Sequence, residues 1–570
     1  MKKRNRSYVL FTIMAVFCGL IWSVTNISYD GMYQISMSQR LISGDKMFLE
    51  MWEPHQTSAF LSAALMWVYE RVFGTTTGIV LYLQICGIVI RGALAVLLYK
   101  VFRRELDKLT AYQMALLFFM ISPKDYALPE FSNIQLWYSA LLFCCLYVYF
   151  RTGRRILLVG SALFLCLEVL AYPSCLVVYP GIIGLLFCFS EKKWRDILLF
   201  TSICAGAGIG VCGYFMVTIG WETFGQCITG MLSLEPSHTV GASAKLLSYL
   251  MDILKTMPVY LGAGAVSFFV SQVYRKIFGK KGGQEKFKDK QGRRQLWMLC
   301  FTGVFLAGFF FNILSADKRN AYTLILLFLV TAGAWNAKGL EREEKRLYWC
   351  LSVIGGLGFL AALILSDLSL FSSVPYGLLA ILAAWIPISK MRVSAEAKRG
   401  IGVCFACFVI LLAFRCVYVR TPMTGRGQIC SVFSDLSMVR TGPAFGIITN
   451  DEGVYIERDS YPEWEKWIRP GDKVWIIGSV VNTLGYLYED VEVAGPSTMS
   501  TPSYNSAILE YWRLNPDKYP DVIVAECPYM ENMIYELLMN DWLQTWLEEE
   551  YQAEVVETGT YWKYFIRKAR

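Results

Sequence analysis

The chain opens with MKKRNRSYVLFTIMAVFCGLIWSVTNI, residues 1–27, in which a short basic segment precedes a long apolar run. A run of this length is enough to cross the hydrocarbon core of a bilayer as a helix. A basic start followed by an apolar run is also typical of a signal peptide, but no small-x-small cleavage site closes this one. We therefore interpret it as a retained first membrane span.

The composition of the whole chain extends this interpretation. Of the 570 residues, 55% are hydrophobic and only 18% are charged, whereas a soluble protein carries about 25% charged residues. Aromatic residues make up 15% of the chain, and Trp and Tyr are enriched at bilayer interfaces. The sequence thus predicts a polytopic α-helical membrane protein. The net charge of +8 comes from loops beside the spans, so it does not indicate nucleic-acid binding.

Apolar windows long enough to span a bilayer predict about thirteen transmembrane helices. They lie near residues 8–27, 78–99, 110–122, 134–150, 156–172, 174–190, 197–219, 256–274, 296–314, 321–336, 347–365, 375–389 and 400–418. Lys and Arg gather in alternate connections, as in KVFRRELDK after the second window and RTGRR after the fourth. Basic loops are typically cytoplasmic. The pattern predicts a multi-pass protein of the plasma membrane, with a cytoplasmic N-terminus and an extracytoplasmic C-terminal end.

The composition changes after the last window, where Tyr and charged residues become more frequent. Short apolar runs (AFGIIT, KVWIIGSVV, DVEVAG and DVIVAE) predict strands, and SAILEYWRL and the run over residues 531–551 predict helices. We therefore expect a transmembrane domain over residues 1–419, with an external loop at 28–77, and a soluble extracytoplasmic α/β domain over 420–570. This second domain shows no glycine-rich nucleotide motif and no nucleophile elbow.

The first external loop begins with YDGMYQISMSQRLISGDKMFLEMWEPHQ, residues 29–56. Its amphipathic first part predicts a helix that ends at Gly44. A second helix is predicted to follow, capped by Thr57 or Ser58 and ended by Gly74. Its apolar part is too short to span a bilayer, so we expect both helices to lie on the outer membrane face.

Ionisable groups gather at the outer ends of several predicted spans. Asp30, Glu53 and Glu130 supply carboxylates, and Arg319 supplies a cation at the outer end of the tenth span. A carboxylate can take the proton of an acceptor hydroxyl or amine, while a cation neutralises a departing phosphate. Acids and a cation at one membrane depth therefore favour transfer of a group from a lipid-linked phosphate. An isolated acid beside a span is more often just an interfacial residue.

At these positions the chain resembles the C-type membrane glycosyltransferases, in particular the protein O-mannosyltransferase and lipid A aminoarabinose transferase group. The motifs that carry the resemblance are Tyr29-Asp30-Gly31-Met32-Tyr33, Gly44-Asp45, Trp52-Glu53-Pro54, Pro129-Glu130 with Asn133, and Arg319 with Tyr322. Two positions depart from the family pattern, because Gly31 replaces a second acid and Pro54-His55-Gln56 replaces a basic residue with paired prolines.

The resemblance implies a glycosyltransferase (a hexosyl or pentosyl transferase) that moves a sugar from a polyprenyl-phosphate donor to a glycan, lipid or protein acceptor at the extracytoplasmic face. It implies catalytic roles for Asp30, Glu53 and Glu130. The implied substrate-binding residues are Tyr33, His55, His238, Arg319 and Tyr322. A divalent cation held by Asp30, Glu53 and His55 is left open, because His55 stands where the family has a basic residue.

Two other function classes are compatible with the sequence. One is a transporter or flippase of a lipid-linked glycan, although the chain shows no clear internal repeat and its charges gather at one face instead of the midplane. The other is a non-catalytic scaffold or sensor whose external domain binds a ligand. That alternative explains the C-terminal domain but not the acids of the first loop.

Overall fold

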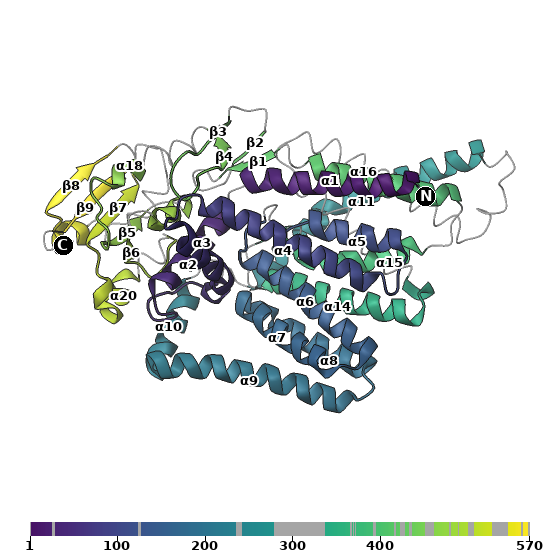
Figure 1. Cartoon of the computed structure of the whole chain (residues 1–570), viewed down its shortest axis with the longest axis horizontal. Coiled ribbons are helices and arrows are strands. Elements are labelled where there is room, and N and C mark those ends of the chain that lie inside the picture. The colour runs from purple at the N-terminus through teal and green to yellow at the C-terminus, as the bar shows by residue number, and fades with distance from the viewer. Residues whose placement is uncertain are drawn as a thin grey trace.

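The computed structural model of the protein contains a bundle of long helices with a β-sheet at one end, and the N-terminus lies at the opposite end (Figure 1). It describes the chain apart from residues 1, 26–28, 124–126, 235–241, 279–336, 365–367, 369, 371, 391–394, 415–417, 422–427, 432–435, 451–460, 478–479, 488–489, 500–506, 527–544, 560–561 and 568–570.

Helices dominate the first three quarters of the described chain. They are α1 (Lys2–Thr25), α2 (Tyr29–Ser43), α3 (Ala59–Phe73), α4 (Ile79–Phe102), α5 (Lys108–Met120), α6 (Phe131–Thr152), α7 (Arg155–Ala171), α8 (Val178–Phe189), α9 (Lys193–Ile219), α10 (Trp221–Leu234), α11 (Ala242–Phe278), α14 (Arg342–Ile364), α15 (Leu378–Ser389) and α16 (Ala395–Phe414). Short 3-10 turns are η1 (Gln56–Ser58), η2 (Pro173–Val177), η5 (Ala337–Gly339) and η6 (Val374–Gly377).

The helices confirm a multi-pass membrane protein. Two predicted spans, near 296–314 and 321–336, lie outside the described residues, and a helix overlaps each of the others. By length and composition, five described helices can cross a bilayer. These are α1, α4, α6, α9 and α14. The count of thirteen spans therefore stays a prediction.

The loop expected after the seventh span is largely helical. It contains α10 and the part of α11 from Ala242 to residue 255, because α11 begins well before the predicted start of the eighth span at residue 256. In α10, Phe224 and Cys227 are buried and three positions apart, so they share one face of the helix. The glycines and polar residues on its other positions lower the hydropathy, which is why the sequence there indicated a loop.

Ion pairs connect the basic loops to one another at the end of the bundle that carries the N-terminus. Arg151 lies 3.2 Å from Glu105 and 3.3 Å from Glu343, and Lys390 lies 2.6 Å from Glu344. These residues belong to connections that the charge pattern placed on one side of the membrane. Their contacts agree with that part of the predicted alternation.

The C-terminal part contains a five-stranded mixed sheet in the order β6-β5-β7-β9-β8. Its strands are β5 (Lys473–Ile477), β6 (Glu492–Val493), β7 (Val522–Glu526), β8 (Val555–Thr558) and β9 (Trp562–Ile566). The pairs of β5 with β6 and β7 are parallel, whereas β9 pairs antiparallel with β7 and β8. Two small antiparallel pairs precede it, namely β1 (Tyr418–Thr421) with β2 (Gln428–Ser431), and β3 (Leu436–Met438) with β4 (Ile448–Asn450).

Several predicted elements of this part are confirmed. Strands occur in all four runs predicted as strands, and α20 (Ile508–Leu514) occupies the first predicted helix. The run KVWIIGSVV ends as a strand at Ile477, and a 3-10 segment, η9 (Val480–Leu487), follows. Further helical segments here are α18 (Tyr461–Trp464), η10 (Pro516–Lys518) and the turn η12 (Leu547–Tyr551).

The first loop packs into this C-terminal part. In Figure 1, α2 and α3 lie between the long helices and the sheet. Trp52 and Cys227 share one hydrophobic cluster with Trp475 and Tyr511, and the rings of Trp52 and Tyr511 meet edge to face at 5.5 Å. The sheet and the adjacent end of the helices therefore form one continuous packed region.

Candidate active site

Helix α2 supplies Asp30 and Tyr33 at the end of the bundle next to the sheet. Asp30 is the second residue of α2 and is partly buried. A carboxylate in the first turn interacts favourably with the positive end of the helix dipole. Tyr33, less than one turn later, is 2% exposed and belongs to the main hydrophobic core. The start of α2 is thereby held against the bundle.

The two helices of the first loop end where the sequence predicts. Gly44 follows α2 and Gly74 follows α3, and both have positive φ, which a glycine adopts at little cost. The predicted side-chain cap of α3 is wrong, since the side chain of the preceding Ser58 makes no capping hydrogen bond to the helix. The Ser58 hydroxyl donates to Gln34 Oε1 instead, at 2.9 Å.

Glu53 is buried completely, with both of its carboxylate oxygens engaged. Its Oε1 lies 3.4 Å from Arg40 Nη1 and accepts from the Thr498 backbone N–H at 2.7 Å. Its Oε2 accepts from the Ser497 hydroxyl at 2.7 Å. The carboxylate thus joins the loop after α2 to the segment that follows β6.

Arg40 is the centre of this junction. Its Nε lies 2.7 Å from Asp45 Oδ2 and its Nη1 donates to the Pro496 carbonyl at 3.3 Å. It also donates to the Glu50 carbonyl. On the other oxygen of Asp45, the Lys518 ammonium lies at 2.6 Å. Because an unpaired charge in such a site is costly, the compensating partners are needed for folding.

Two groups of this junction, Arg40 and Tyr511, have shifted pKa values. Burial acts to lower the pKa of Arg40, but the electrostatic effects of Asp45, Tyr511 and Glu53 raise it well above its ordinary value. Burial likewise raises the pKa of the Tyr511 hydroxyl far above its ordinary value. Arg40 therefore stays protonated and Tyr511 stays neutral over the physiological range.

His55 lies in an aromatic stack at the start of α6 and the end of α7. Its ring is 4.1 Å from the ring of Phe131, with an angle of 7° between the planes, and 5.2 Å from the ring of Tyr172. Thr57, two residues further, donates to the Leu170 carbonyl. The loop is therefore fixed on the two helices at a point directly next to Glu130.

Glu130 is the N-cap residue directly before α6 and is completely buried. Its carboxylate accepts from the backbone N–H groups of Asn133 at 2.8 Å and Ser132 at 3.0 Å, and from the Ser132 hydroxyl at 2.7 Å. These are donors that a helix start leaves without an intrahelical partner. The Glu130 carboxylate therefore caps the start of α6.

The chain segments that carry Asp30 and Glu130 pack in the same region. Leu128, two residues before Glu130, packs in one cluster with Met32, two residues after Asp30. The approach is possible because a Cβ at Gly87 of α4 would overlap the backbone at Ala127. The structure thus brings Asp30, His55 and Glu130 to one end of the bundle, while Glu53 lies in the junction with the C-terminal part.

Three of the predicted substrate-binding residues do not belong to the part of the chain that the structure describes. His238, Arg319 and Tyr322 lie outside the described residues. Among the residues that are described, no three His, Cys, Asp or Glu side chains are grouped so as to hold a metal ion. The trio of Asp30, Glu53 and His55 does not fit a metal site, because Arg40, Ser497 and Thr498 already engage Glu53.

Two charged residues within predicted spans have internal partners. Arg91 of α4 is 3% exposed and donates to the carbonyls of Phe118, at 3.0 Å, and Ile121, near the end of α5. Glu168 of α7 is fully buried and accepts from the Ser139 hydroxyl at 2.5 Å and from Gln135 Nε2 at 3.3 Å. Polar partners of this kind are how a membrane protein accommodates charges in its bundle.

Sequence reasoning missed Arg40, Lys518 and the aromatic partners of His55. Arg40 carried a weak signal, since a cation in the last turn of α2 stands five residues before Asp45 across the glycine stop. Nothing in the sequence connects Lys518 with the first loop. Phe131 and Tyr172 stand directly at the start of α6 and the end of α7, where aromatic residues are expected at a bilayer interface in any case.

No protein-family model and no curated protein matches the chain. Solved structures do match it over most of its length. The apo oligosaccharyltransferase of Archaeoglobus fulgidus is 12% identical with a TM-score of 0.47, covering 97% of this chain and 74% of that chain. The same archaeal enzyme, AglB, in complex with an inhibitory peptide and a dolichol-phosphate is 10% identical with a TM-score of 0.43, covering 92% and 71%.

ArnT from Cupriavidus metallidurans in the apo state is 11% identical with a TM-score of 0.43, covering 99% of this chain and 98% of that chain. AglB and ArnT are both C-type glycosyltransferases, the class that the first loop resembles. Because these TM-scores lie below 0.5, the functional assignment rests on this chain's own residues.

Proposed function

We propose that this protein is a membrane glycosyltransferase that moves a sugar from a polyprenyl-phosphate donor to an acceptor at the extracytoplasmic face. The observation that carries the proposal is that Asp30, His55 and Glu130 lie at one end of a membrane helix bundle, on segments that pack against the same helices. This end is opposite to the loops rich in Lys and Arg, so the positive-inside rule makes it the outer end. Soluble nucleotide sugars are not expected outside the cell, which favours a donor carried in the bilayer.

The proposed step is a single displacement. An acceptor hydroxyl or amine attacks the anomeric carbon of the sugar, and the bond from that carbon to the phosphate oxygen breaks. The Asp30 carboxylate takes the proton from the acceptor, and the electron pair of the broken bond leaves with the polyprenyl phosphate. Phosphate is a good leaving group, so no separate general acid is needed. Arg319 and Tyr322 remain the proposed donor-phosphate contacts from the resemblance.

The other two acids receive different proposed roles. Glu130 caps α6 and presents the end of this helix beside His55, so we assign it the positioning of the acceptor. Glu53 has both oxygens engaged inside the protein, and we therefore assign it the positioning of the loop. The C-terminal part, proposed as an extracytoplasmic domain over 420–570, supports that loop through Arg40 and Lys518.

The test is donor consumption by the purified full chain, supplied with a panel of polyprenyl-phosphate sugars. Asp30→Asn is expected to reduce transfer to background while leaving the protein folded in detergent. Glu510→Gln, at an exposed residue of α20, is the matched control and should retain full activity. Undiminished transfer by Asp30→Asn would overturn the assignment of the base. Transport of an intact lipid-linked glycan across proteoliposomes, without donor consumption, would instead indicate a flippase.

A further inference from the structure

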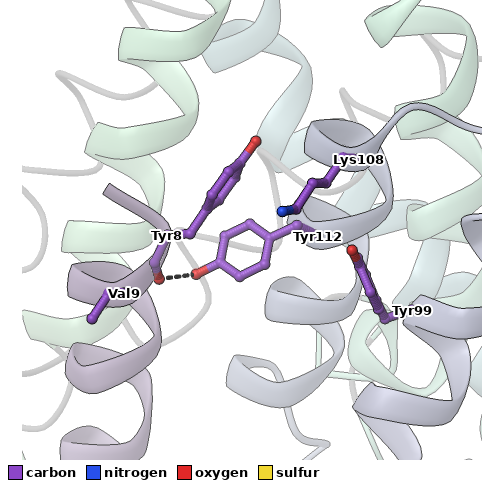
Figure 2. A pocket seen from close by; sticks show the side chains of 5 residues that line it. All are labelled: Tyr8, Val9, Tyr99, Lys108 and Tyr112. Carbon is purple, nitrogen blue, oxygen red and sulfur yellow. Dashed lines mark hydrogen bonds between the residues drawn. The ribbon is translucent and has the colours of Figure 1, made fainter. Parts of the chain in front are cut away.

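A cavity of about 310 Å³ lies between α1, α4 and α5 (Figure 2), at the end of the bundle away from the sheet (Figure 1). It is lined by Tyr8, Val9, Tyr99, Lys108 and Tyr112. Its volume is at the lower end of the range of about 300–1,000 Å³ for small-molecule sites. The proposed transfer does not use it, because Asp30 follows the other end of α1.

Two tyrosines form fixed walls of this cavity. The Tyr112 hydroxyl donates to the Tyr8 carbonyl at 2.8 Å and lies 2.9 Å from the Thr12 hydroxyl. The rings of Tyr8 and Tyr112 meet edge to face, with centroids 4.7 Å apart and an angle of 69°. These contacts hold α1 against α5, so the cavity is formed before any ligand enters.

Lys108 supplies a positive charge inside this frame. Its ammonium lies 5.8 Å from the centroid of the Tyr8 ring, and Figure 2 shows it pointing toward the rings of Tyr8 and Tyr112. The adjacent carboxylate of Asp107 accepts from the backbone N–H groups of Leu109 and Thr110 instead. Among the described residues, no carboxylate forms an ion pair with Lys108. Its charge is therefore available to an anion.

The surroundings of the cavity combine positive charge with an apolar surface. Arg103 and Arg104, in the turn between α4 and α5 that precedes Lys108 in the chain, are exposed. Along α1, Val9, Leu10 and Ile13 are 58%, 64% and 61% exposed, and they continue away from the cavity toward the middle of the span. An anionic head group with an attached hydrocarbon chain matches this arrangement, since basic pockets between membrane helices bind phospholipid head groups.

We propose that this cavity binds the phosphate head group of an anionic glycerophospholipid, with Lys108 as the main contact and an acyl chain along the exposed face of α1. A free phosphate ion would use the charge but not the apolar face, so the lipid is the ligand that the whole arrangement favours. That the lipid belongs to the inner leaflet rests on the proposed orientation of the chain. Neither the binding of the lipid nor the experiment that tests it depends on that orientation.

The experiment titrates the full chain in detergent with dioleoylphosphatidylglycerol and counts bound lipid by native mass spectrometry. Dioleoylphosphatidylcholine and glycerol 3-phosphate are the comparison ligands. The matched control for Lys108→Gln is Lys193→Gln, because Lys193 also lies over a ring, 4.6 Å from the centroid of Phe187, at the same end of the bundle and outside the cavity. Tyr99→Ala is a second variant, which alters the cavity wall without changing any charge.

The expected result is one saturable phosphatidylglycerol whose affinity falls at least fivefold in Lys108→Gln and in Tyr99→Ala but not in Lys193→Gln. Glycerol 3-phosphate should not displace it at equal concentration. The proposal is overturned if phosphatidylcholine binds equally well, if glycerol 3-phosphate alone occupies the site, or if Lys108→Gln and Lys193→Gln have the same effect. A thermal melt of each variant shows that the comparison is made on folded protein.

Discussion

The Lys518 ammonium lies 2.6 Å from one oxygen of the Asp45 carboxylate, although the two residues are 473 positions apart in the chain. Arg40 holds the other oxygen of Asp45 at 2.7 Å. The carboxylate is therefore shared between the end of α2 and the segment after α20. This sharing makes the C-terminal part a structural support of the loop over residues 28–77.

Arg40→Ala should destabilise this junction strongly. It leaves Asp45 and Glu53 buried without their guanidinium partner, and removal of one member of a buried ion pair costs about 3–5 kcal/mol. Arg40→Lys should restore only part of the loss, since an ammonium cannot reproduce the donor fork. The measurement is thermal unfolding in detergent, followed by tryptophan fluorescence. Arg513→Ala, which breaks the exposed pair with Glu510, is the control, and the same melting curve for both alanine variants would contradict the role of Arg40.

Substitutions of His55 can separate its packing on Phe131 from a contact with the donor phosphate. His55→Phe keeps a flat ring on Phe131, where the two rings are 4.1 Å apart, so its melting temperature should match that of the wild type. If the imidazole contacts the donor phosphate, this variant loses a hydrogen bond to a charged group, worth about 1.5–3 kcal/mol. The donor KM should then rise about tenfold or more. His55→Ala should lower stability as well, and unchanged kinetics for His55→Phe would restrict the residue to packing.

Glu130→Gln tests whether the buried cap also acts on substrate. The amide oxygen still accepts from the helix start, so stability should fall by only about 1 kcal/mol, while transfer should fall at least a hundredfold. The matched control is Asp107→Asn, because the Asp107 carboxylate caps α5 in the same manner at the other end of the bundle. It should show a similar loss of stability with normal transfer. Equal activity of the two variants would leave Glu130 as a structural residue.

Local features of the fold were predictable from the sequence, and long-range pairings were not. The stops at Gly44 and Gly74, the helices at most predicted spans and the strand β7 follow from periodicity and backbone preference. Strands β8 and β9 were missed because charged and polar residues interrupt their apolar pattern. The partners of Glu53 could not be predicted, because Arg40, Ser497 and Thr498 meet it only through the packing of the C-terminal part on the loop.

The candidate site shows the same division. The resemblance directed attention to Asp30 and Glu130, and the structure brings the residues beside them into one cluster. The resemblance could not distinguish a catalytic acid from an acid such as Glu53 that joins the loop to the C-terminal part. In the sequence, both are isolated carboxylates beside an apolar segment. Only burial and the identity of the partners separate Glu53 from Asp30.

Glu70 of α3 should make stability depend on pH. Burial raises the pKa of this carboxyl, and Asp490 adds to the effect, while Oε1 of Glu70 has no hydrogen-bond partner among the described residues. A raised pKa means that the fold favours the protonated form, so this contribution is present at low pH and is lost as the pH rises through the folded pKa. Glu70→Gln should therefore melt higher than the wild type at pH 8 and equally at pH 4. Asp490→Asn should give a smaller shift of the same sign, and a pH-independent difference for Glu70→Gln would show that the carboxyl charge carries no cost in the fold.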